Sequence, residues 1–172
     1  RRRAADLQRL VEAVGQIPGV TNAGITTNTP LQRPSFDSVY SIEGRPVVNP
    51  NEVPITAHRV VTPDYLRAIG VRLLGGRLLS DSDTADAPRV VLITEELARQ
   101  AWPGEDPIGR HIRRGRATDT HHPWLTVVGV VGDVKEDRSN FRIDRAAWYL
   151  PYAQEHSAAP PNLVIESQAD PG

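Results

Sequence analysis

The segment AWPGEDPIGRH comes closest, of all stretches in this chain, to the spacing of a catalytic motif. Gly104 and Gly109 followed by Arg110 match the first part of a phosphate-binding P-loop, G-x-x-x-x-G-K-[ST]. That motif next requires a lysine and then a hydroxyl, but Arg110 and His111 occupy these places. Pro107 also removes a backbone N–H from a loop that would have to present such groups to phosphate. The segment follows a predicted helix and opens a strand, the reverse of P-loop order. We therefore interpret it as a rigid turn.

Histidines are the next candidates, because His111, His121 and His122 lie near Asp119 in the sequence. A zinc site needs three or four ligands at defined spacing, with further groups to orient them. Adjacent His121 and His122 point apart in an extended chain, and both precede Pro123 in a polar loop. The pattern indicates a solvated loop, and we predict no metal site.

Acidic residues cluster at Asp81, Asp83 and Asp86, a weak likeness to a calcium-binding loop. The glycine and the terminal bidentate glutamate of an EF-hand are missing, so the pattern favours a charged surface turn. A second acidic group, Asp133 with Glu136 or Asp137, follows a predicted strand, as catalytic acids can. Basic residues interleave this group, which is typical of a solvated turn.

Nucleophilic catalysis has no support in the sequence. The chain has no cysteine, and no serine lies in the G-x-S-x-G turn that exposes a catalytic hydroxyl. The serines considered are Ser35, Ser38, Ser41, Ser80, Ser82, Ser139, Ser157 and Ser167. We predict no catalytic, cofactor-binding or metal-binding residue, and a binding or mechanical module rather than an enzyme.

Nucleic-acid binding is also disfavoured. Four arginines, at 110, 113, 114 and 116, form a basic stretch, but no aromatic residue interleaves them and the net charge is −1. A solvent-facing strand and hairpin is the better interpretation of Arg110–Arg116. With 39% hydrophobic and 24% charged residues, the composition is typical of a globular domain with a real core. The longest apolar runs, Val90–Ile93 and Leu125–Val131, are too short to cross a bilayer.

Three helices are predicted to carry these segments. Leu7, Leu10, Val11 and Val14 form one apolar stripe at helical spacing. A second helix spans Pro63–Ile69, with Thr62 as N-cap and Gly70 after its end. A third follows Thr94 as N-cap and closes at Trp102-Pro103-Gly104.

Eight strands are predicted from β-branched or alternating runs. They span 20–27, 38–43, 55–61, 90–93, 110–114, 125–131, 147–150 and 163–166. Gly129 and Gly132 in one of them indicate bulges or close packing. The irregular order of strands and helices predicts the α+β class.

Four segments in order then carry a resemblance to a known family. They are VTPDYLRAIGVRLLGGRLLSDSDTADAP (61–88), RVVLITEELARQAWPGEDPIGRHI (89–112), WLTVVGVVGDVKED (124–137) and AAWYLPYAQ (146–154). Together they resemble the MacB-like periplasmic core domain of ABC transporter permeases, the group with FtsX-like membrane segments. The N-terminal LQRLVEAVGQIPGVTNAGITTNTPL (7–31) also fits this domain.

The resemblance implies a porter-like βα subdomain with a second, mostly β subdomain inserted into it. Residues 1–76 and 162–172 would form the first part and residues 77–161 the insert. It also implies a periplasmic domain between the first two membrane helices of an inner-membrane permease. A cytoplasmic ABC ATPase would drive it, with a second permease copy and a periplasmic adaptor as further partners, for export or signalling across the envelope.

The family pattern continues beyond a turn like Ala169–Gly172 into a further helix and strand. We therefore expect the first subdomain to lack a half and to expose apolar surface. Two other functions stay open: a soluble enzyme, such as a hydrolase, built on Asp133–Asp137 and the nearby histidines, and a free-standing extracytoplasmic binding or adaptor module.

Overall fold

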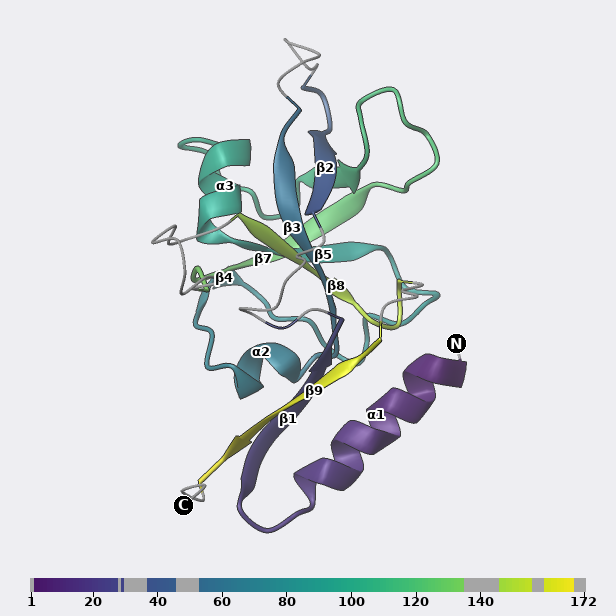
Figure 1. The fold of residues 1–172 in the computed structure, drawn as a ribbon. Coiled ribbons are helices and arrows are strands. Elements are labelled where there is room, and N and C mark those ends of the chain that lie inside the picture. The colour runs from purple at the N-terminus through teal and green to yellow at the C-terminus, as the bar shows by residue number, and fades with distance from the viewer. Residues whose placement is uncertain are drawn as a thin grey trace.

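Residues 2–27, 29, 37–45, 53–134, 146–155 and 160–168 are described in a computed structural model. They form three helices and nine strands, which confirms the α+β class (Figure 1). The helices are α1 (Arg2–Gly15), α2 (Tyr65–Ala68) and α3 (Glu95–Ala101). The strands are β1 (Val20–Thr26), β2 (Asp37–Ile42), β3 (Ile55–Val61), β4 (Leu73–Gly76), β5 (Val90–Thr94), β6 (His111–Arg114), β7 (Leu125–Val131), β8 (Ala147–Pro151) and β9 (Asn162–Ser167).

Six of the strands close into a mixed barrel. The sheet runs β2-β6-β7-β5-β8-β3-β1-β9, and β2 also pairs with β3, so the first six strands form a ring. Within it β3–β8 and β5–β7 are parallel, while the other pairs are antiparallel. Closure matters because a ring of strands leaves no free edge for a foreign strand.

The interior of this ring is the largest apolar cluster. It draws Tyr40 from β2, Ile93 from β5, Ile112 from β6, Val127 from β7 and Trp148 from β8. α3 packs onto the same cluster. We call the six barrel strands, with β4 and α3, the head.

β1 and β9 leave the ring beyond β3 and, with α1, extend below the head (Figure 1). We call these three elements the arm. α2 lies against β1 and also joins a cluster with β5 and β7 of the head. The division at residues 76 and 161 stays a prediction, although β2 and β3, assigned to the first part, pair with strands of the second.

α1 covers one face of β1, as its apolar stripe predicts. Val11 and Val14 pack on Ala23 and Ile25, with Leu7 at the margin. Leu10 is the exception, since it is 44% exposed. One turn of helix is 3.6 residues, so Leu10 lies on the flank of the stripe rather than on its centre.

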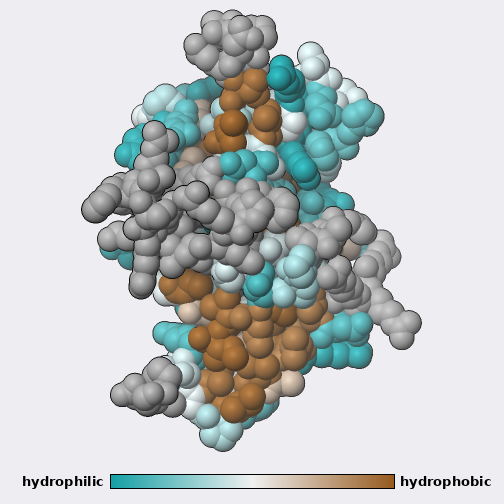
Figure 2. Space-filling model, viewed as in Figure 1, coloured by the Kyte–Doolittle hydropathy of each residue, from teal (hydrophilic) through white to brown (hydrophobic). Residues whose placement is uncertain are grey.

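Apolar side chains also remain exposed on β9. Leu163 and Ile165 pair with Ile25 and Ala23 of β1, so they share the face that α1 covers, yet they are 39% and 46% exposed. Figure 2 shows the apolar side chains gathered over this lower part of the molecule. Exposed apolar surface in the arm therefore agrees with the sequence-based expectation.

α2 begins later than predicted. It starts at Tyr65, and the Thr62 hydroxyl does not cap it. Instead Thr62 Oγ1 accepts a hydrogen bond from the backbone N–H of Ile25 in β1 at 2.8 Å. A tertiary partner thus replaces the local N-cap contact that the sequence pattern favoured. Gly70, with φ +68°, follows the helix in the left-handed conformation predicted for it.

α3 confirms its predicted boundaries. Thr94 Oγ1 accepts from Leu97 N–H at the N-cap, and Trp102 follows the helix with 2% of its surface exposed. The predicted set of strands omitted β4, because Leu73–Gly76 ends in two glycines, which are poor strand formers. Gly76 is needed there, since a Cβ at this position would lie 2.3 Å from the carbonyl oxygen of Val128 in β7. A Cβ at Gly129 would come equally close to the carbonyl oxygen of Arg77, which confirms the close packing predicted for this glycine. A Cβ at Gly132 would make only an ordinary contact, at 3.8 Å.

Candidate functional site

The P-loop-like segment is a turn between α3 and β6. Gly104 and Gly109 both have positive φ, near +74° and +79°. The N–H groups that a phosphate would need are used inside the protein: Ile108 N donates to Asp106 Oδ1, and Gly109 N donates to the carbonyl oxygen of Val127. This arrangement fixes the turn against β7 and leaves no cradle of free amides between residues 108 and 110.

The histidine candidates do not converge. His111 Nδ1 lies 2.5 Å from Glu43 Oε2, in an exposed pair between β6 and the end of β2. Asp119 accepts a hydrogen bond from the backbone N–H of His121, so its carboxylate supports its own loop. Over the described ranges, no three His, Cys, Asp or Glu side chains gather closely enough to hold a metal ion.

Asp83 of the acidic loop has a structural partner instead. Its two carboxylate oxygens accept from the guanidinium of Arg77 at 2.7 and 2.9 Å, and it also accepts from Ser80 N–H. Burial alone would raise the pKa of Asp83, but the bonds from Arg77 and Ser80 outweigh it and lower the pKa below its ordinary value. The predicted charged surface turn is correct for exposed Asp81 and Asp86 and wrong for Asp83, which is 4% exposed.

Gln154 holds the same loop from the other side. Its amide donates to the carbonyl oxygens of Thr84 and Pro88 and accepts from Val90 N–H. This buried side chain, which sequence patterns did not indicate, ties residues 84–90 to the segment after β8. These hydrogen bonds hold the loop of residues 84–90 in a fixed position.

Asp133, a candidate acid, caps a helix. Its Oδ1 accepts from the backbone N–H of Glu96 in the first turn of α3 at 2.9 Å. Negative charge at this end of a helix is favourable. Glu136 and Asp137, its suggested partners, lie outside the described residues, as do Ser35, Ser139 and Ser157. Of the other serines, Ser41 donates to Gly115 and Ser80 lies beside Asp83.

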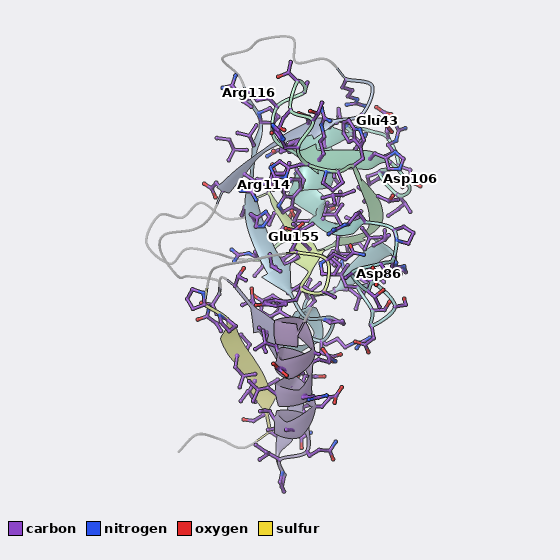
Figure 3. The ribbon with its side chains drawn as sticks, turned by 90° about the vertical axis from the view of Figure 1, so that its right-hand side faces the viewer. Glu43, Asp86, Asp106, Arg114, Arg116 and Glu155 are labelled. Carbon is purple, nitrogen blue, oxygen red and sulfur yellow. The ribbon has the colours of Figure 1, made fainter. Side chains whose placement is uncertain are left out.

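The basic stretch is only partly solvent-facing. Arg114 and Arg116 are exposed at the end of the head away from α1 (Figure 3). Arg113 is 9% exposed, and its guanidinium lies 4.4 Å from the ring centre of Trp124. The prediction for Arg113 was wrong because its aromatic partner lies eleven residues away on the chain, beyond any local pattern.

Sequence patterns also missed His58. Its Nδ1 accepts from the indole N–H of Trp148 at 3.0 Å, with the rings edge to face. Burial lowers the pKa of His58 to about 4, and the nearby positive charges of Arg114 and His122 add to the effect. His58 is therefore neutral at pH 7 and acts as an acceptor for the core tryptophan.

β1 of the arm meets the end of β3 and the start of α2 at a close backbone contact. A Cβ at Gly24 would lie 2.3 Å from Tyr65 Cα and 2.5 Å from Tyr65 N. Thr62 N–H donates to the carbonyl oxygen of Ile25, which completes the pair formed by the Thr62 hydroxyl. Thr27 bonds Val60 in the same way, through its N–H and its hydroxyl. We call this contact of residues 24–27 with residues 60–65 the joint.

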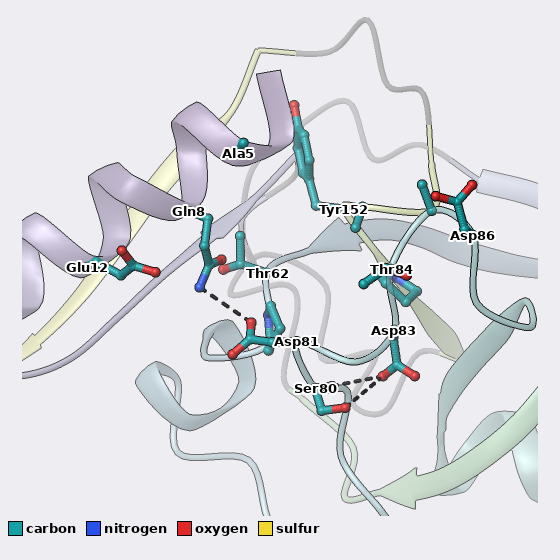
Figure 4. A pocket seen from close by; sticks show the side chains of 14 residues that line it. Ala5, Gln8, Glu12, Thr62, Ser80, Asp81, Asp83, Thr84, Asp86 and Tyr152 are labelled. Atoms are coloured by element: carbon teal, nitrogen blue, oxygen red, sulfur yellow. Dashed lines mark hydrogen bonds between the residues drawn. The ribbon is translucent and has the colours of Figure 1, made fainter. Parts of the chain in front are cut away.

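Beside the joint lies a pocket of about 560 Å³. Ala5, Gln8 and Glu12 of α1 form one wall, and the loop with Asp81 and Asp86 forms the other (Figure 4). Tyr152 also lines the pocket, and its ring lies beside the N-terminal part of α1 with the hydroxyl pointing away from Gln8 and Asp81 (Figure 4). Among the described residues, Gln8 with Asp81 at 3.4 Å is the one hydrogen bond across the pocket. The site is therefore a cavity at the boundary of arm and head, lined by both apolar and acidic side chains.

Comparison with known proteins identifies the family. The family model described as the MacB-like periplasmic core domain matches residues 2–171. The chain belongs to the MacB-like periplasmic core domain family. It is thus a periplasmic domain of the kind found in MacB/FtsX-like ABC transporter permeases.

Three solved structures share this fold. The periplasmic region of MacB from Actinobacillus actinomycetemcomitans is 16% identical with a TM-score of 0.62, over 94% of this chain and 64% of its own. A domain of a Porphyromonas gingivalis protein, described as a permease, is 22% identical with a TM-score of 0.58, over 95% and 68%. The extracellular domain of the noncanonic ABC-type transporter YknZ from Gram-positive bacteria is 11% identical with a TM-score of 0.58, over 95% and 73%.

This MacB-like domain spans about 64% of the length of the MacB periplasmic region that it matches. Among curated proteins there is no match. None of the helices within the described ranges combines the length and the apolar character needed to cross a membrane.

Proposed function

We propose that this MacB-like domain transmits ATP-driven conformational change in an ABC transporter permease, without catalysing a reaction itself. The domain would stand outside the inner membrane, attached through flanking membrane helices to a permease whose cytoplasmic ATPase supplies the energy. Export or signalling across the envelope would be the output, with a second permease copy and a periplasmic adaptor as partners. Family membership supports this proposal.

The observation that carries the mechanical part is the joint. The first helix and the last described strand both pack on β1, so force applied through either end reaches the same strand. β1 is bonded to residues 60–62 by reciprocal hydrogen bonds and touches Tyr65 through its backbone at Gly24. A contact without intervening side chains has little freedom to yield, because packed interiors transmit strain. The arm and head would then move as one body.

The test uses the parent permease with its ATPase in lipid vesicles. The chain has no cysteine, so single cysteines can be labelled at chosen places. A donor dye at Arg99→Cys, an exposed position on α3, reports the height of the head by energy transfer to a dye on the outer lipid headgroups. A second pair, Gln16→Cys with Arg99→Cys, reports the distance between arm and head.

We expect ATP to change the transfer to the lipid dye and to leave the arm-to-head distance unchanged. An ATPase that binds but cannot hydrolyse ATP is the control for the role of turnover. If neither distance responds to ATP, the domain is not a transmission element. If only the arm-to-head distance responds, the joint is a hinge, and the single-body mechanism is wrong.

A further inference from the structure

The indole N–H of Trp148 donates its hydrogen bond to a side chain that can gain a proton. Trp148 is fully buried in the interior of the head, and its N–H donates to Nδ1 of half-buried His58 at 3.0 Å. The two residues lie directly opposite each other in the parallel pair of β3 and β8, and their ring centres are 6.0 Å apart. An indole N–H can only donate, so this geometry requires a neutral His58 ring with its proton on Nε2.

Protonation of His58 would turn this hydrogen bond into a contact between two donors. The imidazolium carries an N–H on both ring nitrogens, so Nδ1 no longer accepts from the indole. Within the described part of the chain, Trp148 has no other hydrogen-bond partner. A buried N–H without a partner is unfavourable. The protonated ring therefore favours an arrangement in which the two side chains separate.

The charged groups around His58 act in the same direction. Arg114 at the end of β6 and His122 in the loop that follows are both positive neighbours of the ring. Tyr40 of β2, whose ring packs on the same indole, stays uncharged, since burial raises the pKa of its phenol. Arg59 follows in β3 and faces the other side of the sheet, because side chains alternate along a strand. Burial, and then the two positive neighbours, lower the pKa of His58 to about 4, and no carboxylate of the described residues opposes them.

We propose that the His58–Trp148 pair is an acid-sensitive latch: when His58 takes up a proton, Trp148 is released and β3 separates locally from β8. The pair is the second of five register pairs between these strands, so the opening lies toward the end of the head away from the joint. The neighbouring pairings limit it, because β8 stays bonded to β5 and β3 stays bonded to β2. The latch does not depend on the transmission role and can be tested without a permease.

Proton linkage sets the size of the effect. In the open state we expect His58 to regain the ordinary pKa of 6.5, whereas in the closed state its pKa is about 4. The open state then binds more protons, so opening becomes more favourable as the pH falls from 6.5 toward 4. Between pH 7 and pH 5 the equilibrium constant for opening should rise by roughly 25-fold.

The test is native-state hydrogen exchange of the ¹⁵N-labelled 172-residue chain, followed by NMR at pH 7 and pH 5. The chain has three tryptophans, so its spectrum holds three indole signals. We expect Trp148 to exchange through a local opening that is insensitive to low urea, whereas Trp102 of the same apolar cluster should exchange only on urea-sensitive global unfolding. After correction for intrinsic exchange, the protection of Trp148 should fall by roughly 25-fold from pH 7 to pH 5.

A variant and its control separate His58 from other titrating groups. His58→Asn puts an amide oxygen, which does not titrate, where Nδ1 accepts, and the fall in Trp148 protection should shrink to less than about threefold. His121→Asn removes an exposed histidine of the nearby loop and should leave the roughly 25-fold fall unchanged. The wild-type ring gives a direct measurement without any variant: at pH 7 its ¹⁵N signals should show a proton on Nε2 and none on Nδ1.

Three results would overturn the proposal. The first is a His58 ring with its proton on Nδ1 at pH 7. The second is exchange of Trp148 and Trp102 at equal and equally urea-sensitive rates, which would mean that the pair opens only when the whole domain unfolds. The third is an unchanged pH dependence of Trp148 exchange in folded His58→Asn, which would assign the effect to other groups.

Discussion

Gly24→Ala tests the joint directly. The added Cβ would lie 2.3 Å from Tyr65 Cα, and both atoms that it meets first belong to the backbone of α2. Relief requires β1 and α2 to separate by about 1 Å, since carbon atoms pack at roughly 3.5 Å or more. Overpacking of this kind costs about 1–3 kcal/mol. Loss of the two hydrogen bonds between Ile25 and Thr62 adds about 1 kcal/mol each.

The expected loss of unfolding free energy is therefore about 3–5 kcal/mol. For a domain of this size that corresponds to a fall in Tm of roughly 6–20 °C, measured by circular dichroism. Gly15→Ala is the matched control, because a Cβ there meets nothing within 4 Å. In that control the free energy of unfolding should rise by about a few tenths of a kcal/mol, as is typical when alanine replaces a glycine whose backbone conformation it can adopt. If Gly24→Ala loses less than about 1 kcal/mol, the joint is not the close contact described above.

Three other predictions concern the head. Trp102→Ala should cost about 3–5 kcal/mol in urea unfolding, because the ring is fully buried beside α3, whereas half-buried Trp124→Ala should cost clearly less. Equal losses would contradict that difference in packing. Asp83→Asn should lose about 1.5–3 kcal/mol at pH 7. The folded pKa of Asp83 is lowered, so its contribution is present above the ordinary value of 3.8 and is lost as the pH falls below it. The variant should lack this part of the acid-induced loss, and an unchanged acid profile would refute the role of the Arg77 pair. The pKa of His58 is lowered from 6.5 to about 4, so the unfolded chain takes up a proton first and stability falls as the pH drops from 6.5 toward 4. His58→Gln keeps an acceptor for Trp148 and should show a flatter dependence between pH 7 and pH 5, by about 1–2 kcal/mol; identical slopes would show that His58 does not titrate in this way.

Local sequence signals predicted the elements whose cause is local. The stripe of Leu7, Val11 and Val14, the Thr94 cap and the left-handed Gly70 are each set within one or two turns of chain. The local signals gave wrong predictions where a partner distant in the sequence determines what the side chain contacts. Thr62 bonds Ile25, and Arg113 stacks on Trp124, so neither side chain does what its neighbours in sequence indicate.

At the candidate site, too, some features follow from local sequence and others depend on residues distant in the chain. The near P-loop could be rejected from Pro107 and from the order of helix and strand, without a structure. The pocket could not be found in this way, because its walls come from α1, from residues 62–63 and 80–86, and from residues 151–153. Gly24 carries no local turn signal, and only its distance to Tyr65 gives it a role.

Pairing of β1 with β9 also has a consequence for how the chain folds. Asn22 and Glu166, which bond across this pair, are 144 residues apart. A ribosome must therefore synthesise the chain as far as β9 (Asn162–Ser167) before the outer edge of β1 can find its partner, and long loops close slowly. The barrel can close earlier, since its last strand ends at Pro151. During synthesis the head is then expected to form first, leaving β1 with an open edge that a chaperone could bind until β9 emerges.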